Sequence, residues 1–194
     1  MGDGWHRKQG AAGGDMDFID TQTGHETALI TLFTDVFNAS EGAAEGGLIG
    51  GLVTDLLTAT PPGDLRVFAA LDDGDIIGAI LFSRLSFEGD PRSVFMMAPV
   101  AVATARHGQG VGQAVIRHGL AALLADGVDV AVTYGDPAYY GKTGFRPVTQ
   151  DDLPPPMPLQ FPHGWLAQPL GRATMTPFAG PSSCVPAFDK PELW

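Results

Sequence analysis

Three glycines alternate with other residues near the middle of the chain, at Gly108, Gly110 and Gly112. An apolar run over residues 93–104 precedes them, and apolar residues at helical spacing follow over 110–125. Such glycines let successive backbone N–H groups turn toward one point, and the N-terminus of the following helix adds unpaired N–H groups and its dipole. The pattern predicts either a phosphate-binding turn or a tight strand-to-helix turn that serves packing alone.

Two other phosphate-binding patterns are excluded at this turn. No G-x-x-x-x-G-K-S/T sequence occurs, so the turn is not a P-loop. Counting from Gly108, the third glycine of a G-x-G-x-x-G motif would fall at position 113, which is Gln113.

At these residues the sequence resembles the GNAT superfamily of N-acetyltransferases. The acetyl-CoA signature of that family, Q/R-x-x-G-x-G/A, is matched by His107-Gly-Gln-Gly110-Val-Gly112, with histidine where glutamine or arginine is usual. The preceding Val100-Ala101-Val102 is similar to the strand that leads into the signature. Further on, Gly135-Asp-Pro-Ala-Tyr139-Tyr140-Gly-Lys-Thr-Gly144-Phe145 resembles the GDPxYYxxxGF form found in a subgroup of bacterial acetyltransferases of undefined substrate.

The resemblance implies transfer of an acetyl group from acetyl-CoA to a primary amine of a small molecule by direct attack. It places the CoA pyrophosphate on the backbone of residues 106–112 and the pantetheine arm along the strand edge at residues 100–102. A backbone N–H near Val102 would polarise the thioester carbonyl. The cofactor-binding residues implied are Val100, Ala101, Val102, Arg106, His107, Gly108, Gln109, Gly110, Val111, Gly112, Gln113 and Tyr139.

The resemblance also places Tyr140 at the position of the general acid. A phenol with an ordinary pKa of about 10 can give its proton to the departing thiolate. Tyr139 is the adjacent competitor, but successive residues of a helix point about 100° apart, so only one of the two can reach the sulfur. The alternative is that Tyr140 packs its ring in the core and hydrogen-bonds its hydroxyl.

The general base stays unassigned. Asp35 and Glu41 lie near the first helices, which shape the acceptor site in this family, and Glu88 and Asp90 precede the apolar strand. Each of the four is more typical of a solvated surface charge.

The acidity of the chain is uneven. Residues 1–90 hold 15 Asp/Glu and 4 Lys/Arg, whereas residues 91–194 hold 7 of each, so the first half carries the whole net charge of −11. This suggests a cationic acceptor, such as a polyamine, an amino sugar or a basic amino-acid derivative, drawn in by the negative field. The alternative is that the charge serves solubility. A uniformly basic nucleic-acid binder is excluded.

Other function classes find little support in the sequence. No apolar window approaches the roughly 18 residues of a membrane span, and no signal peptide is recognised, so we expect a cytoplasmic protein without a membrane partner. Cys184 is the single cysteine, and the histidines lack the spacing of metal ligands, so we expect no disulfide and no metal.

Hydrophobic periodicity predicts the element order ααβββαβαβ. A capping box at Thr23 and Glu26 begins the first helix, the second helix ends before Pro61, and Asp73-Gly74 forms a hairpin turn. This is an α+β fold, and the resemblance implies a GNAT-like mixed, mostly antiparallel central sheet with helices on both faces.

Three segments are expected along the chain. Residues 1–15 form a disordered leader, residues 16–150 the acetyltransferase domain, and residues 151–194 a proline-rich extension packed on the surface of the same domain. The resemblance implies a homodimer as a common assembly. A non-catalytic acyl-CoA sensor and a protein that binds a small ligand or partner without CoA remain as alternative functions.

Overall fold

The computed structural model describes residues 16–194, and the predicted leader at 1–15 lies outside the described residues. The longer elements agree with the hydrophobic periodicity, and the bounds are as follows: β1 (Asp17–Ile19), α1 (Glu26–Glu41), α2 (Ala43–Ala59), β2 (Leu65–Asp72), β3 (Asp75–Phe87), β4 (Asp90–Val102), α3 (Val111–Ala125), β5 (Val130–Tyr134), α4 (Pro137–Tyr140), β6 (Arg146–Pro147), β7 (Trp165–Pro169) and β8 (Ser182–Cys184).

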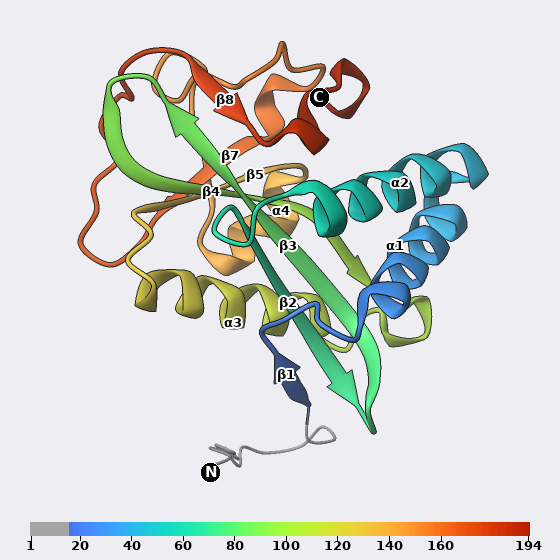
Figure 1. Ribbon diagram of the computed structural model, residues 1–194. Coiled ribbons are helices and arrows are strands. Elements are labelled where there is room, and N and C mark those ends of the chain that lie inside the picture. Colours follow the sequence, from blue (N-terminus) through green and yellow to red (C-terminus); the bar gives the residue numbers. More distant parts are fainter. Residues whose placement is uncertain (1–15) are drawn as a thin grey trace.

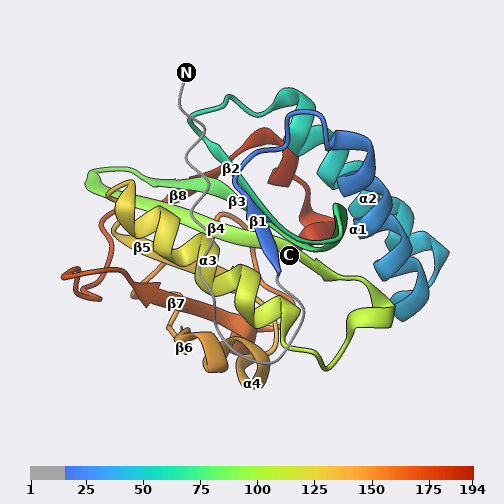
Figure 2. The ribbon, with the colours of Figure 1, turned by 90° about the horizontal axis from the view of Figure 1, so that it is seen from below.

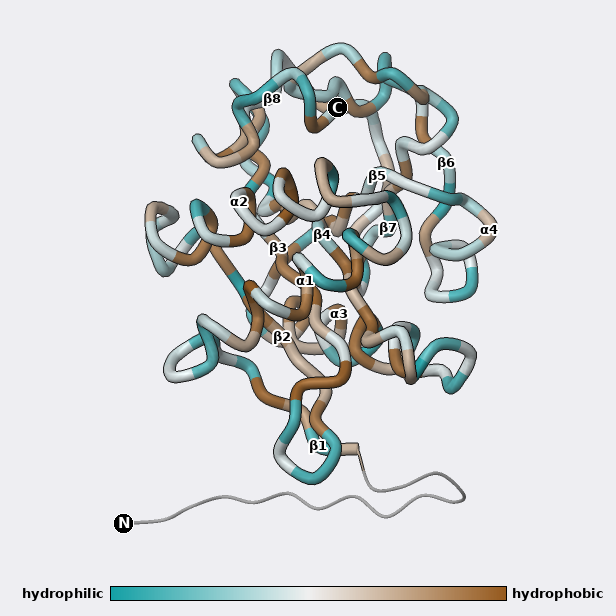
Figure 3. Tube along the Cα trace, turned by 90° about the vertical axis from the view of Figure 1, so that its right-hand side faces the viewer, coloured by the Kyte–Doolittle hydropathy of each residue, from teal (hydrophilic) through white to brown (hydrophobic). Residues whose placement is uncertain are grey.

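A single mixed sheet organises the described chain, in the order β1-β2-β3-β4-β5-β7-β6, with β8 paired to β3. Every pairing is antiparallel except that of β4 with β5. Helices α1 and α2 cover one face and α3 covers the other (Figures 1 and 2). The apolar segments follow the sheet and the sides of the helices that face it (Figure 3). The predicted mixed, mostly antiparallel sheet with helices on both faces is confirmed.

Two expectations near the N-terminus need correction. The sequence analysis omitted β1, because three residues that pair only with β2 leave no readable periodicity. The capping box is wrong as well: α1 begins at Glu26 after His25, and no side chain caps it. The N–H of Thr23 instead bonds the hydroxyl of Thr21, at 3.1 Å.

The C-terminal segment enters the sheet and the core, whereas the sequence suggested packing on the surface. Strand β7 lies between β5 and β6, and β8 extends the pairing of β3. The last strand of the predicted order is only the two-residue β6 at the sheet edge. The segment also places four large aromatic side chains in the core: Trp165, Phe178, Phe188 and Trp194.

Strands β4 and β5 separate at a defined point. They pair from Val94 with Val130 to Met97 with Thr133, and the Thr133 hydroxyl donates to the Met97 carbonyl at 2.9 Å. Beyond Met97, β4 continues to Val102 and pairs with β3 alone. In that pairing Leu81 of β3 lies opposite two residues of β4, Ala98 and Pro99, which form a β-bulge. Beyond this point a gap opens between β4 and β5, and residues 98–102 present an open strand edge toward it.

The hairpin of α1 and α2 closes one side of this gap and depends on glycine for its close packing. A Cβ atom on Gly46 would lie 2.8 Å from the Thr34 carbonyl oxygen, and one on Gly50 would lie 2.3 Å from the Thr34 hydroxyl. Larger residues at these two positions would force the helices apart. The glycines thus fix the position of the last turn of α1, which lines the site described below.

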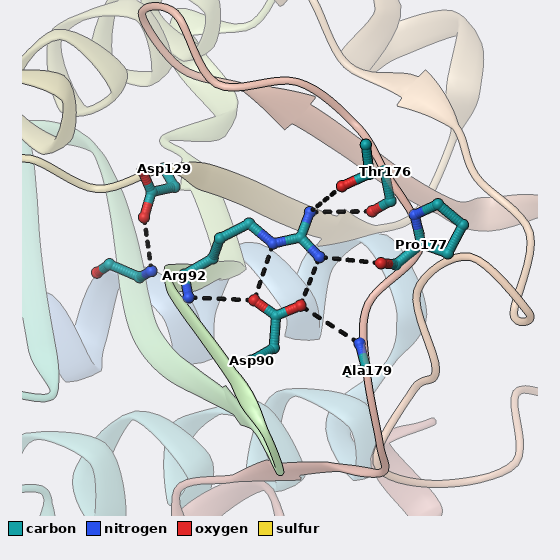
Figure 4. A network of polar contacts seen from close by, with 7 residues as sticks. Asp90, Arg92, Asp129, Thr176, Pro177 and Ala179 are labelled. Atoms are coloured by element: carbon teal, nitrogen blue, oxygen red, sulfur yellow. Dashed lines mark hydrogen bonds and ion pairs between the residues drawn. The ribbon is translucent and has the colours of Figure 1, made fainter.

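A charged pair fastens the C-terminal segment to the start of β4 (Figure 4). The side chains of Asp90 and Arg92 form two hydrogen bonds with each other, at 2.6 and 2.9 Å, and are only 9% and 18% exposed. The guanidinium also donates to the carbonyls of Thr176 and Pro177 and lies over the ring of Phe178, 3.4 Å from its centroid. The Arg92 guanidinium holds the pKa of Asp90 well below its usual range.

Replacing Asp90 by Asn should lower the free energy of unfolding at pH 7 by about 3–5 kcal/mol, because a mostly buried guanidinium loses its partner. The depressed pKa means that the stabilisation is present above the unfolded pKa of about 4 and is lost as the pH falls. The acid side of the stability profile should therefore be flatter in the variant. Urea denaturation at a series of pH values measures both effects.

Asp64→Asn provides the matched control. Asp64 also pairs with an arginine, Arg84, at 2.6 Å, but both side chains are 36% exposed. Its loss should cost less than about 1 kcal/mol. Equal losses in the two variants would contradict the role given to the Asp90–Arg92 pair.

Candidate active site

Two adjoining cavities occupy the gap between β4 and β5. The larger, called the turn cavity, measures about 590 Å³ and lies between the glycine turn, the end of α1 and α4. The smaller, called the apolar cavity, measures about 320 Å³ and lies between α1, α2, the bulged part of β4 and the C-terminal residues. Both are lined by Phe37, Glu41, Val100 and Tyr140. These four residues mark the junction of the two cavities.

The turn cavity is lined by the predicted cofactor residues except Ala101 and Gln109. Ala101 is 2% exposed and belongs to the core on the α1–α2 face, so only its backbone can face the gap. Gln109 turns its side chain back to donate to the Ala105 carbonyl at 3.2 Å. Val100 and Val102, on either side of Ala101, line the cavity with their side chains.

The three glycines of the turn are required for different structural reasons. Gly108 and Gly110 adopt φ angles of +75° and +81°, which L side chains rarely accept. Gly110 precedes the first residue of α3, and no side chain caps this helix, so its first N–H groups remain available to an anion. Gly112 makes room for a neighbour, because a Cβ atom there would lie 2.1 Å from the hydroxyl of Tyr139.

Several basic side chains surround the turn. Arg106 is held by Asp72 from the β2–β3 turn. His107 places Nε2 2.9 Å from the Val102 carbonyl, which accepts its proton. Lys142, which sequence analysis did not assign to the site, lines the cavity from the opposite side. Arg117 donates to the Lys142 carbonyl at 3.2 Å and to Gln113 at 3.0 Å.

The two tyrosines of α4 have different positions. Asp136, two residues after the end of β5, caps this short helix by accepting a hydrogen bond from the Ala138 N–H at 2.8 Å. Tyr140 lines both cavities, whereas Tyr139 lines the turn cavity only, and their rings meet edge to face at 5.0 Å. Burial raises the pKa of Tyr140 to about 12 and also raises that of Tyr139. Tyr140 is therefore a protonated donor at neutral pH.

Half of the residues that line the apolar cavity belong to segments that carry no motif in the sequence. They come from α1, α2 and the C-terminal residues Phe188, Leu193 and Trp194, and most of the other half comes from β4. Of the four acids considered as a base, only Glu41 lines either cavity. Within residues 16–194, no group of three or more His, Cys, Asp or Glu side chains is placed to hold a metal ion.

Comparison with known sequences assigns the central segment of the chain to a family. The model of the acetyltransferase (GNAT) domain matches residues 63–147, which include the strands β2–β5, the glycine turn, α3 and α4. This segment is a GNAT acetyltransferase domain. The predicted resemblance is thereby confirmed, and with it the dependence of such a domain on an acyl-CoA.

Relatives of the GNAT domain occur in Escherichia coli. The uncharacterized N-acetyltransferase YjhQ of strain K12 is 36% identical over 109 residues, 54% of this chain and 60% of YjhQ. The uncharacterized N-acetyltransferase YhbS of the same strain is 36% identical over 89 residues, 46% of this chain and 53% of YhbS. The matches thus span a little more than half the length of these relatives.

Solved structures extend the likeness beyond the matched sequence. The crystal structure of YhbS from Escherichia coli in complex with CoA superposes with a TM-score of 0.74 and 25% identity, covering 95% of this chain and 97% of that one. A GNAT family acetyltransferase from Brucella melitensis, in complex with acetyl-CoA, shares the fold with a TM-score of 0.69 at 24% identity, covering 90% of this chain and 98% of that one.

In the described part of this chain, no helix is long and apolar enough to cross a bilayer.

Replacing Gly110 by Ala should weaken the binding of CoA at least tenfold, equivalent to about 1.4 kcal/mol, because a side chain at the start of α3 distorts the N–H groups of the turn. Calorimetric titration with CoA measures the effect. Gly127→Ala is the control, since Gly127 has a similar φ of +78° at the other end of α3. Both variants should lose about 1–2 kcal/mol of stability. Equal CoA affinities would contradict the placement of the phosphates.

Proposed function

We propose that this protein transfers an acetyl group from acetyl-CoA to a primary amine of a small molecule, with Tyr140 as the general acid. The observation that carries the proposal is the position of Tyr140 at the junction of the turn cavity and the apolar cavity. A proton donor at that point lies between the cofactor and the acceptor.

The turn cavity suits the cofactor. The positive φ angles of the turn and the uncapped start of α3 supply N–H groups for the pyrophosphate, and Lys142 adds a positive charge. The open edge of β4 at residues 98–102 can pair with the amides of the pantetheine arm, as an added strand does. In this arrangement the thioester reaches the junction, where a backbone N–H of β4 near Val102 polarises its carbonyl.

The reaction is a direct displacement. The neutral amine nitrogen attacks the thioester carbonyl carbon, a C–N bond forms, and the C–S bond breaks. The CoA sulfur leaves as a thiolate and takes the Tyr140 proton, while the amine loses one proton to solvent. The Tyr140 phenolate then takes a proton from solvent, which restores the acid for the next turnover. Because burial raises the pKa of Tyr140 to about 12, the phenol still carries its proton when the thiolate forms.

Tyr140→Phe should lower kcat by about 10² to 10⁴-fold, the usual contribution of a general acid, while CoA affinity changes less than about twofold. Steady-state release of CoA and calorimetry measure the two quantities. Tyr139→Phe is the control and should leave kcat within a few-fold, because Tyr139 does not line the apolar cavity. A Tyr140→Phe enzyme with normal kcat would refute the acid role. CoA binding without transfer to any amine would favour the alternative function of an acyl-CoA sensor.

The pH dependence should reflect the raised pKa of Tyr140. A general acid works only while protonated, and a group with a pKa of about 12 keeps its proton well beyond pH 10. An ordinary phenol would be half ionised near pH 10. We therefore expect kcat not to fall between about pH 8 and pH 10. A decline of kcat with a midpoint near pH 10 would contradict the assignment of Tyr140 as the general acid.

A further inference from the structure

The apolar cavity has a lining that constrains the acceptor. Aliphatic and aromatic side chains from α1, α2, β4 and the C-terminal segment form most of its wall, among them Phe37, Leu52, Met97, Phe188 and Trp194. Two tyrosine hydroxyls and one carboxylate are the ionisable side-chain groups there, from Tyr134, Tyr140 and Glu41. The Tyr134 oxygen already accepts a hydrogen bond from the Phe161 N–H at 2.7 Å.

Glu41 is the one acidic or basic side chain that lines the apolar cavity, and it lies at the junction with the turn cavity. Its carboxylate forms no ion pair with the described residues. Other acids of the first half are engaged elsewhere, as Asp72 is with Arg106, Asp55 with Lys190 and Asp64 with Arg84. The acidic side chains that suggested a polyamine as acceptor therefore do not cluster around the apolar cavity.

The balance of charges in the cavity favours one ammonium group over several. A single carboxylate can pair with one ammonium at the junction, where the reaction takes place. A second cationic group would have to enter the apolar wall, and an unpaired charge there costs several kcal/mol. An uncharged apolar body instead gains free energy when its surface is removed from water.

We propose that the acceptor is a primary monoamine with an apolar, aromatic-sized body, its amine directed to Glu41 and its body held in the apolar cavity. This inference rests on the proposed function and names the substrate class for the same site. A volume of about 320 Å³ is at the small end of ligand cavities and suits a compact molecule. Glu41 is exposed to solvent, so it can pass the amine's released proton to water.

The C-terminal segment determines this specificity. Trp194 donates from Nε1 to the Phe188 carbonyl at 2.9 Å, and its ring meets those of Phe188 and Trp165 edge to face at 6.1 Å. Lys190 pairs with Asp55 of α2 at 2.8 Å, which fastens the segment to the helix that forms the opposite wall. Leu193, between these contacts, is partly exposed and lines the cavity.

The test compares 2-phenylethylamine with spermidine as acceptors, with acetyl-CoA as donor and release of CoA as readout. We expect kcat/KM for 2-phenylethylamine to exceed that for spermidine at least tenfold. A preference for spermidine would overturn the inference. Glu41→Gln should raise KM for 2-phenylethylamine about fivefold or more and leave CoA affinity unchanged, whereas an unchanged KM would remove Glu41 from the site.

A second measurement does not depend on turnover. Calorimetry of each amine with the CoA-saturated protein should detect 2-phenylethylamine and not spermidine. Binding of spermidine alone, or of neither amine, would overturn the inference. Failure to bind CoA at all would instead refute the proposed function, so the two failures are distinguishable.

Leu193→Glu changes the cavity wall directly. It adds a second carboxylate, so it should lower the preference for 2-phenylethylamine over spermidine at least tenfold. Leu124→Glu is the matched control, because Leu124 lies on α3, is 47% exposed and lines neither cavity. The control should keep the preference of the unmodified protein. Equal preferences in Leu193→Glu and Leu124→Glu would show that the acceptor does not contact this wall.

Discussion

The separation of β4 from β5 after Met97 and Thr133 is the constraint on which the site depends. Up to that point the two parallel strands share hydrogen bonds, and beyond it β4 pairs only with β3. A strand edge inside a sheet leaves backbone groups without strand partners, which is costly unless a ligand or solvent satisfies them. The gap therefore both opens the two cavities and supplies polar groups for an extended, amide-rich ligand.

Backbone N–H groups can attract an anion even though the chain as a whole is negatively charged. A protein of net charge −11 repels a polyanion at long range, yet the turn presents N–H groups at the start of α3, with Lys142 nearby. Of the acidic side chains near this region, Asp72 is held in an ion pair by Arg106. In the proposed anion site, the local geometry of the turn therefore counts for more than the global charge.

The C-terminal segment completes the structure at the other end of the gap. Its aromatic side chains enter the core, and its last residues line the apolar cavity. The sequence match to YhbS covers 46% of the chain, whereas the structural match covers 95%. The fold outside the matched sequence is thus shared while many of its residues differ, and residues 188–194 lie among those that would distinguish one acceptor from another.

The sequence by itself determined the main elements, the glycine turn and the family, because these depend on local periodicity, on conformations that only glycine adopts easily, and on two motifs at fixed spacing. It also singled out Tyr140 as the candidate acid. Tertiary structure alone decided that Tyr140 lies at a junction of two cavities, that Glu41 faces both, and that residues 188–194 form a wall. The C-terminal wall arises from contacts between segments far apart in the chain, such as Lys190 with Asp55, and no local pattern encodes such contacts.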